Sequence, residues 1–310
     1  MNLHDKKEKF SILIKLTSDE KNIPVDAVER DYYIVQSLLF LSKSEYSNDC
    51  VFKGGTSLSK CFSSSIERFS EDIDLTYMNT DGKSDKEIER NLKSIEKIMT
   101  YGFESEKIEN ERNRRNKSIW FWLNDRNKRV KLEIGSSVKP EPYSKKIVKT
   151  YIHEYLEKIG RTEDINEFGL VPIELNVLNI ERTFIDKVMA VKRHSICGSI
   201  INKARHIYDV KKLFDMKEIK NFLSNKDELK KIIRLTKQTD SFYLQKRNIP
   251  KEYNPLGEFN FKSWEEDFIK AKSEYENLHK RLLFTSKKQD FDDAIKTFIA
   301  IDEILKEINE

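Results

Sequence analysis

The chain has 310 residues, of which 38% are hydrophobic and 35% charged, and its formal net charge at pH 7 is +4. This composition is typical of a globular protein in water, and the length leaves room for two domains. The longest apolar run, residues 32–41, is too short to span a bilayer. The first residues are charged and lack the apolar segment of a signal peptide, so we do not expect secretion. The three cysteines lack metal-ligand spacing, so we expect reduced thiols in the cytoplasm.

Apolar periodicity and turn residues predict the order of the helices and strands. In the first half we expect, in chain order, a helix over 22–41, a strand at 51–52, a short helix over 56–62, a strand over 72–77, a helix over 86–100 and a β-hairpin with arms 118–123 and 129–134 around a turn at 124–127. In the second half we expect a helix over 149–159, a strand over 173–177 and helices over 181–194, 199–214 and 264–283.

Two short segments, residues 52–60 and 68–75, are the most informative part of the sequence. Gly54 and Gly55 lie where a strand meets a helix, and free backbone N–H groups at such a turn bind phosphate well. Asp72 and Asp74 are two residues apart on the next strand, so their carboxylates point to the same face. This geometry suits Mg²⁺ beside a triphosphate and indicates nucleotidyl transfer. Alternatively, the glycines only turn the chain and the aspartates pair with Arg68 and a lysine.

Glu133 is the natural third carboxylate. It lies on the second hairpin arm, whose strict alternation of apolar and polar residues puts it on a polar face. Two-metal phosphoryl chemistry needs several carboxylates to offset the charge of the ions. The alternative is a surface glutamate neutralised by Lys131 or Arg129.

The two segments, Phe52 to Lys60 and Arg68 to Leu75, resemble the AbiEii family of nucleotidyltransferase toxins, which belongs to the DNA polymerase β-like nucleotidyltransferase superfamily. The resemblance continues at 28–32, 181–190 and 207–210, so it covers roughly residues 20–215. The chain departs from the superfamily pattern in two ways. Gly55 replaces the serine of the usual Gly-Ser pair, and the loop from Gly55 to Asp72 is longer than in most members.

The resemblance implies a role for each matching residue. Asp72 and Asp74 would ligate Mg²⁺, Lys187 would neutralise phosphate charge, and Asp209 would be the acid of the last motif, near the nucleotide. The triphosphate would be cradled by Gly54, Gly55, Thr56 and Ser57. Taken alone, the neighbouring residues allow an alternative for each of the two. Lys187 could extend from a packed helix, and Asp209 could form a surface ion pair with Arg205.

The segment from residue 112 to residue 131 is both basic and aromatic. Basic side chains follow phosphates, and aromatic rings stack on bases that are not paired. The candidate RNA-binding residues are Arg112, Arg114, Arg115, Lys117 and Trp120. Alternatively, the aromatic residues belong to the core and the charges keep the hairpin soluble. A second basic run, residues 226–251, has the same two interpretations.

We therefore expect an α/β (α+β) protein with two lobes. Residues 1–175 would form a small mixed β-sheet nucleotidyltransferase domain, and residues 176–310 a mainly helical domain that completes the active-site cleft. The expected function is Mg²⁺-dependent transfer of NMP from an NTP to RNA, with the tRNA 3′ end as acceptor, by a toxin that has a genetically linked antitoxin. The alternatives are transfer to a small-molecule hydroxyl, such as that of an antibiotic, and an inactive nucleic-acid-binding module.

Overall fold

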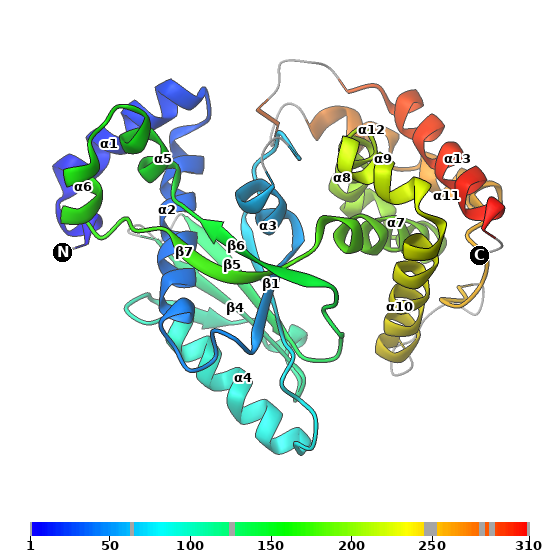
Figure 1. Cartoon of the computed structure of the whole chain (residues 1–310), viewed down its shortest axis with the longest axis horizontal. Helices are drawn as coiled ribbons and strands as arrows, with labels where there is room; N and C mark the ends of the chain where they lie inside the picture. Colours follow the sequence, from blue (N-terminus) through cyan, green and yellow to red (C-terminus); the bar gives the residue numbers. More distant parts are fainter. Residues whose placement is uncertain are drawn as a thin grey trace. The chain divides into compact units, whose positions relative to one another are not determined.

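The computed structural model describes residues 2–62, 65–123, 128–244, 253–278, 283–284 and 289–308 (Figure 1). The chain divides into two compact units. Unit 1 consists of Met1–Cys61, Phe69–Ser136 and Tyr143–Val177, and unit 2 of Phe62–Arg68, Ser137–Pro142 and Leu178–Glu310. Across the described ranges, each helix is too short or too polar to cross a membrane.

Unit 1 is built on a mixed sheet whose described strands follow the order β3-β4-β5-β2-β1-β7-β6. The strands are β1 (Cys50–Lys53), β2 (Asp72–Tyr77), β3 (Ser105–Lys107), β4 (Asn116–Trp122), β5 (Arg129–Gly135), β6 (Tyr143–Val148) and β7 (Ile173–Leu178). The central strand β2 is parallel to β5 and antiparallel to β1, and β5 pairs with β4 as an antiparallel hairpin. The expected mixed sheet and α/β class are confirmed. The expected turn at 124–127 lies outside the described residues.

One face of this sheet is apolar and covered by helices. Alternate residues of β2 and β5, including Ile73 and Leu132, are fully buried, because side chains along a strand point to opposite faces. Helices α2 (Val25–Ser42) and α4 (Asp85–Met99) pack against this face, and a capping box at Ser84 begins α4. We call this the covered face. The opposite side, which carries the polar residues of β2 and β5, is called the polar face.

The remaining α-helices of unit 1 include the short helix that follows β1 and packs against β1, β2 and β6. They are α1 (Lys7–Lys21), α3 (Gly54–Cys61), α5 (Tyr151–Lys158) and α6 (Thr162–Glu167). A buried ion pair ties α3 to α2, with 2.6 Å between Lys60 Nζ and Asp31 Oδ1. The other oxygen of Asp31 accepts a hydrogen bond from the backbone N–H of Tyr151 in α5. Desolvation raises the pKa of Asp31 in spite of the ammonium group. Asp31, which lies outside the segment 52–60, therefore helps to hold α3 in place.

Unit 2 is helical in its described part. Its helices are α7 (Ile180–Ile196), α8 (Ala204–Phe214), α9 (Lys217–Ser224), α10 (Lys226–Leu244), α11 (Glu265–Ile269), α12 (Lys272–Asn277) and α13 (Phe291–Glu307). The helix expected over 264–283 is wrong as a single element, because α11 and α12 are separated by a turn at Lys270 and Ala271. Burial at Trp264, Phe268 and Tyr275 keeps a helical spacing across that turn, which explains the expectation.

Candidate active site

The turn from β1 to α3 requires glycine at position 54. Its φ is +82°, a conformation that L side chains rarely adopt, and a Cβ at this position would lie 2.1 Å from Oδ2 of Asp74. The backbone of Gly54 is therefore packed directly against a carboxylate of the neighbouring strand. The first N–H groups of α3 have no partner within the helix, so this turn offers donors to an anion.

The hydroxyl groups of Thr56 and Ser57 are bonded to the backbone. Both side chains are buried. The Thr56 hydroxyl donates to the carbonyl oxygen of Asp72, and the Ser57 hydroxyl donates to that of Gly54 over 3.0 Å. The Thr56 bond joins the start of α3 to β2, and the Ser57 bond lies within the first turn of α3. The role of the two residues in triphosphate binding stays a prediction.

Asp72 and Asp74 are half-buried and share the polar face of β2, with Ile73 buried between them. The strand register places Asp74 opposite Glu133 of β5, so the three carboxylates belong to neighbouring positions on one face. Glu133 forms an ion pair with Lys131, which also lies 2.7 Å from Glu111. Burial acts to lower the pKa of Lys131, but the two carboxylates outweigh it and raise this pKa.

The donor set of β2 fits a magnesium ion that is shared with a substrate. Among the residues described, no group of three or more His, Cys, Asp or Glu side chains is close enough together to hold a metal ion. Mg²⁺ commonly binds through one or two carboxylates and completes its ligands with substrate phosphates and water. Asp72 and Asp74 match this requirement as two hard oxygen donors beside the glycine turn, whose anion binding stays a prediction. Glu133 as a third ligand stays a prediction.

Three of the basic residues expected to bind RNA form ion pairs with α4. Arg112 Nη1 lies 2.7 Å from Glu96, Arg115 Nη2 2.6 Å from Asp85, and Lys117 Nζ 3.3 Å from Glu89, with the acid on α4 in each pair. Lys117 is buried, and so is the ion pair between Arg112 and Glu96. Because α4 packs on the covered face, these charges hold the hairpin to the helix.

The polar face of the same hairpin carries Trp120 and Trp122 of β4 and Arg129 of β5. The guanidinium carbon of Arg129 lies 4.0 Å from the ring centre of Trp120 and 5.5 Å from that of Trp122. Both tryptophans are half-buried and Arg129 is exposed. Of the candidate RNA-binding residues, Trp120 thus shares a face with Asp72 and Asp74, while Arg114 is exposed in the turn before β4.

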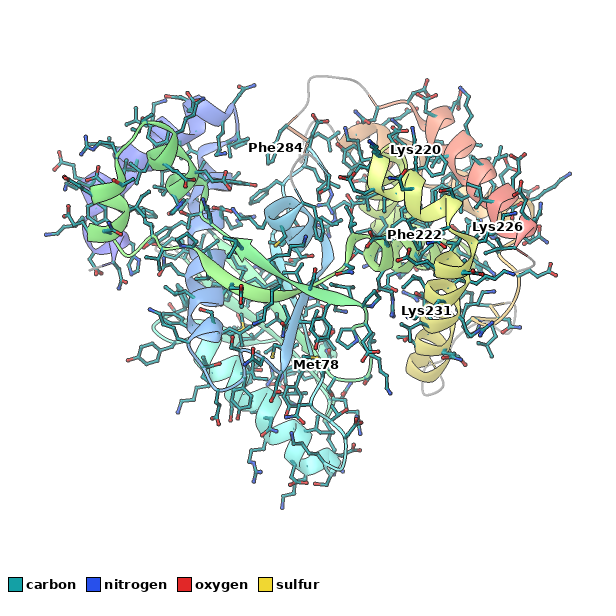
Figure 2. The ribbon with its side chains drawn as sticks, in the orientation of Figure 1. Met78, Lys220, Phe222, Lys226, Lys231 and Phe284 are labelled. Carbon is teal, nitrogen blue, oxygen red and sulfur yellow. The ribbon has the colours of Figure 1, made fainter. Side chains whose placement is uncertain are left out.

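The second basic run lies on α10. Lys226 and Lys231, which Figure 2 labels, are exposed along this helix. Arg234 is also exposed, whereas Lys237 is buried. Lys226 also lies 3.4 Å from Glu307 of α13. The part of this run from residue 245 to residue 251 falls outside the described residues.

In unit 2, Lys187 and Asp209 meet in a buried cluster. Nζ of Lys187 in α7 lies 2.8 Å from Oδ2 of Asp209 in α8. Arg68 binds the same carboxylate through Nε at 2.6 Å and Nη2 at 2.7 Å. Nδ1 of His206 lies 3.4 Å from Lys187 Nζ. Two cations and one carboxylate leave a net charge of +1 in the cluster while His206 is neutral.

Electrostatics fix the protonation of this cluster. Burial acts to raise the pKa of Asp209, but Arg68 and Lys187 outweigh it and hold this pKa well below its ordinary value. Burial and the Lys187 charge lower the pKa of His206 well below its usual range, which keeps the ring neutral. Sequence reasoning missed Arg68 as a member of the site. The available signal was its position four residues before Asp72, inside the same motif.

The family model described as the AbiEii nucleotidyltransferase toxins of type IV toxin–antitoxin systems matches residues 37–297. The chain therefore belongs to the AbiEii family, and it is a nucleotidyltransferase. The resemblance seen in the motifs is confirmed.

The solved structures that are similar to this chain include the following two. MenT4, a nucleotidyltransferase toxin from Mycobacterium tuberculosis, has 17% identity and a TM-score of 0.48, with 95% of this chain and 98% of that chain covered. JHP933 from Helicobacter pylori has 15% identity and a TM-score of 0.39, with 82% of this chain and 94% of that chain covered. None of the curated proteins matches the sequence.

Proposed function

We propose that this protein transfers NMP from an NTP to a hydroxyl group of RNA, with the tRNA 3′ end as the first acceptor to test. It would act in the cytoplasm as the toxin of a toxin–antitoxin pair. The observation that carries the proposal is the contact between the Gly54 backbone and the Asp74 carboxylate, because it joins the turn proposed to bind the phosphates to the strand proposed to bind the metal.

The reaction needs positioning and charge compensation. The acceptor oxygen attacks the α-phosphorus and forms a new P–O bond. The bond to the bridging oxygen breaks, pyrophosphate leaves with its electron pair, and the hydroxyl proton passes to a basic oxygen or to water. Backbone N–H groups at the start of α3 would hold the phosphates. Asp72 and Asp74 would hold Mg²⁺, which supplies positive charge against the triphosphate.

Lys187 is the proposed phosphate-neutralising cation, and Asp209 is the residue that positions it. A carboxylate that accepts bonds from Arg68 and Lys187 holds both cations in one place. Lys187→Arg should therefore keep more transfer activity than Lys187→Ala, because positive charge near the phosphate is the requirement. Equal kinetics of the two variants would assign Lys187 to packing alone.

The test is incubation of the purified protein with each labelled NTP, with total tRNA and, separately, with small hydroxyl-bearing acceptors such as aminoglycosides. We expect label in RNA. Asp74→Asn should abolish labelling, whereas Asp81→Asn, which changes an exposed aspartate in the turn after β2, should leave it intact. Melting temperatures check that both variants fold.

Other outcomes would replace the proposal. Label only in small acceptors would support the antibiotic-modifying alternative. RNA binding without any transfer would support an inactive binding module. Normal labelling by a folded Asp74→Asn protein would remove the proposed metal site.

A further inference from the structure

The polar face of unit 1 carries an arginine whose guanidinium group lies over one indole ring and near a second. We name Trp120, Trp122 and Arg129 the stacking ledge. Arg129 stands directly opposite Trp122 in the antiparallel register and lies over Trp120 at 4.0 Å. Contacts with aromatic faces restrict a guanidinium group to one plane, and they leave its outer face open when the residue is exposed, as Arg129 is.

Arg129 differs from its basic neighbours in its partners. Lys131 pairs with two glutamates, and Arg112, Arg115 and Lys117 pair with acids of α4. Among the described residues, no carboxylate lies within ion-pair distance of Arg129. Among the described residues its printed contacts are with the two rings, so an anionic ligand would displace none of the carboxylates described.

The register sets the distance from the ledge to the aspartates. In the strand register, Trp120 of β4 lies opposite Lys131 of β5, and Lys131 lies opposite Asp72 of β2. These three positions therefore lie side by side on adjacent strands. Strands are about 4.8 Å apart, which puts the backbone of Trp120 about 10 Å from that of Asp72. A nucleotide bound on the ledge would therefore lie close to the carboxylates that are proposed to hold the metal.

We propose that the stacking ledge binds an unpaired base next to the reacting end of the RNA acceptor. The inference rests on the proposed function and adds the acceptor subsite to it. The base stacks on the outer face of the Arg129 guanidinium, which Trp120 supports from behind, and the N–H groups of Arg129 donate to the adjacent phosphate. Single-stranded RNA presents such faces, whereas a duplex hides them.

The experiment measures binding without catalysis. The probes are a short single-stranded RNA of mixed sequence and the blunt duplex made from it, titrated while tryptophan fluorescence is recorded. The signal is selective, because two of the three tryptophans belong to the ledge and Trp264 is buried in unit 2. We expect quenching by the single strand and much weaker binding of the duplex.

Variants separate stacking from charge. Arg129→Lys keeps the charge but loses the plane, and we expect single-strand affinity to fall about tenfold, as for the loss of one base–aromatic stack. Arg90→Lys is the matched control, because Arg90 is an exposed arginine of α4, which packs on the covered face. It should bind like the wild type. NTP binding should be unchanged in both variants.

The outcomes distinguish this inference from the proposed function. Wild-type affinity in Arg129→Lys, or equal binding of single strand and duplex, overturns the ledge even if transfer to RNA occurs. Single-strand binding that depends on Arg129, in a protein that labels no RNA, supports the ledge and overturns the transfer reaction. The absence of any RNA binding by the wild type overturns the ledge, and labelling of RNA then decides the transfer reaction separately.

Discussion

Gly54→Ala should inactivate the enzyme by displacing one carboxylate. The native φ of +82° is strained for any L side chain, and the new Cβ would lie 2.1 Å from Oδ2 of Asp74. Ordinary contacts begin at 3.4 Å. Either Asp74 or the glycine turn must therefore move by roughly 1 Å. A misplacement of that size at a reacting centre costs about 10²-fold in rate.

Gly82→Ala provides the matched control for this variant. Gly82 has φ +70°, but an added Cβ meets nothing within 4 Å. Both variants should lose about 1–2 kcal/mol from backbone strain. A loss of that size lowers the melting temperature by about 2–8 °C for domains of about 150–250 residues. Only Gly54→Ala adds the collision, so it should melt below Gly82→Ala and lose transfer activity as well.

The assay is transfer from labelled NTP to whichever acceptor the wild type modifies, with thermal melting in parallel. We expect transfer near 1% of the wild-type rate for Gly54→Ala, following the estimate of about 10²-fold, and near-normal transfer for Gly82→Ala. Normal transfer by a folded Gly54→Ala protein would refute the reasoning, because the contact between the turn and Asp74 would then have no catalytic consequence.

Three further predictions concern buried charges. Asp209→Asn leaves Arg68 and Lys187 buried without their carboxylate and should cost about 3–5 kcal/mol in a urea titration, and an unchanged midpoint would show that the cluster is open to water. His206 has a lowered pKa, so below pH 6.5 the unfolded chain binds more protons than the folded one. As the pH is lowered below 6.5, the free energy of unfolding should therefore decrease by up to about 1.4 kcal/mol per pH unit. The decrease should be less steep in His206→Gln, measured at matched urea concentrations. Arg112→Ala should lower the melting temperature and Arg114→Ala should not, because only Arg112 has a buried carboxylate partner among the described residues; equal melting would contradict this.

Local pattern was enough for the centre of the sheet and for the motif. The alternation in β2 put Asp72 and Asp74 on one face, and the glycine pair marked the passage from β1 to α3. These features depend on neighbours within a few residues, so the sequence displays them directly. The amphipathic helices α2, α4 and α7 were predicted for the same reason, and each is confirmed within a few residues.

Elements with weak patterns were not predicted. Helix α1 buries Thr17 and Ser18 together with Phe10 and Ile14, so its apolar stripe is incomplete. Strand β6 lies at the edge of the sheet, and Val148 is its one fully buried residue. An edge strand is defined by its pairing partner more than by its own alternation. These elements exist because of what packs against them, which a single sequence does not show.

The sequence by itself determined the family motif, the paired aspartates and the mixed sheet. Only the tertiary structure decided which charges meet. Arg68 and Asp209 are 141 residues apart, and Arg112 reaches Glu96 across the covered face while Arg129 reaches Trp120 on the polar face. All three arginines look equivalent in the sequence. Their partners differ because strand register and helix packing place each guanidinium in a different environment, and that environment depends on contacts far apart in the chain.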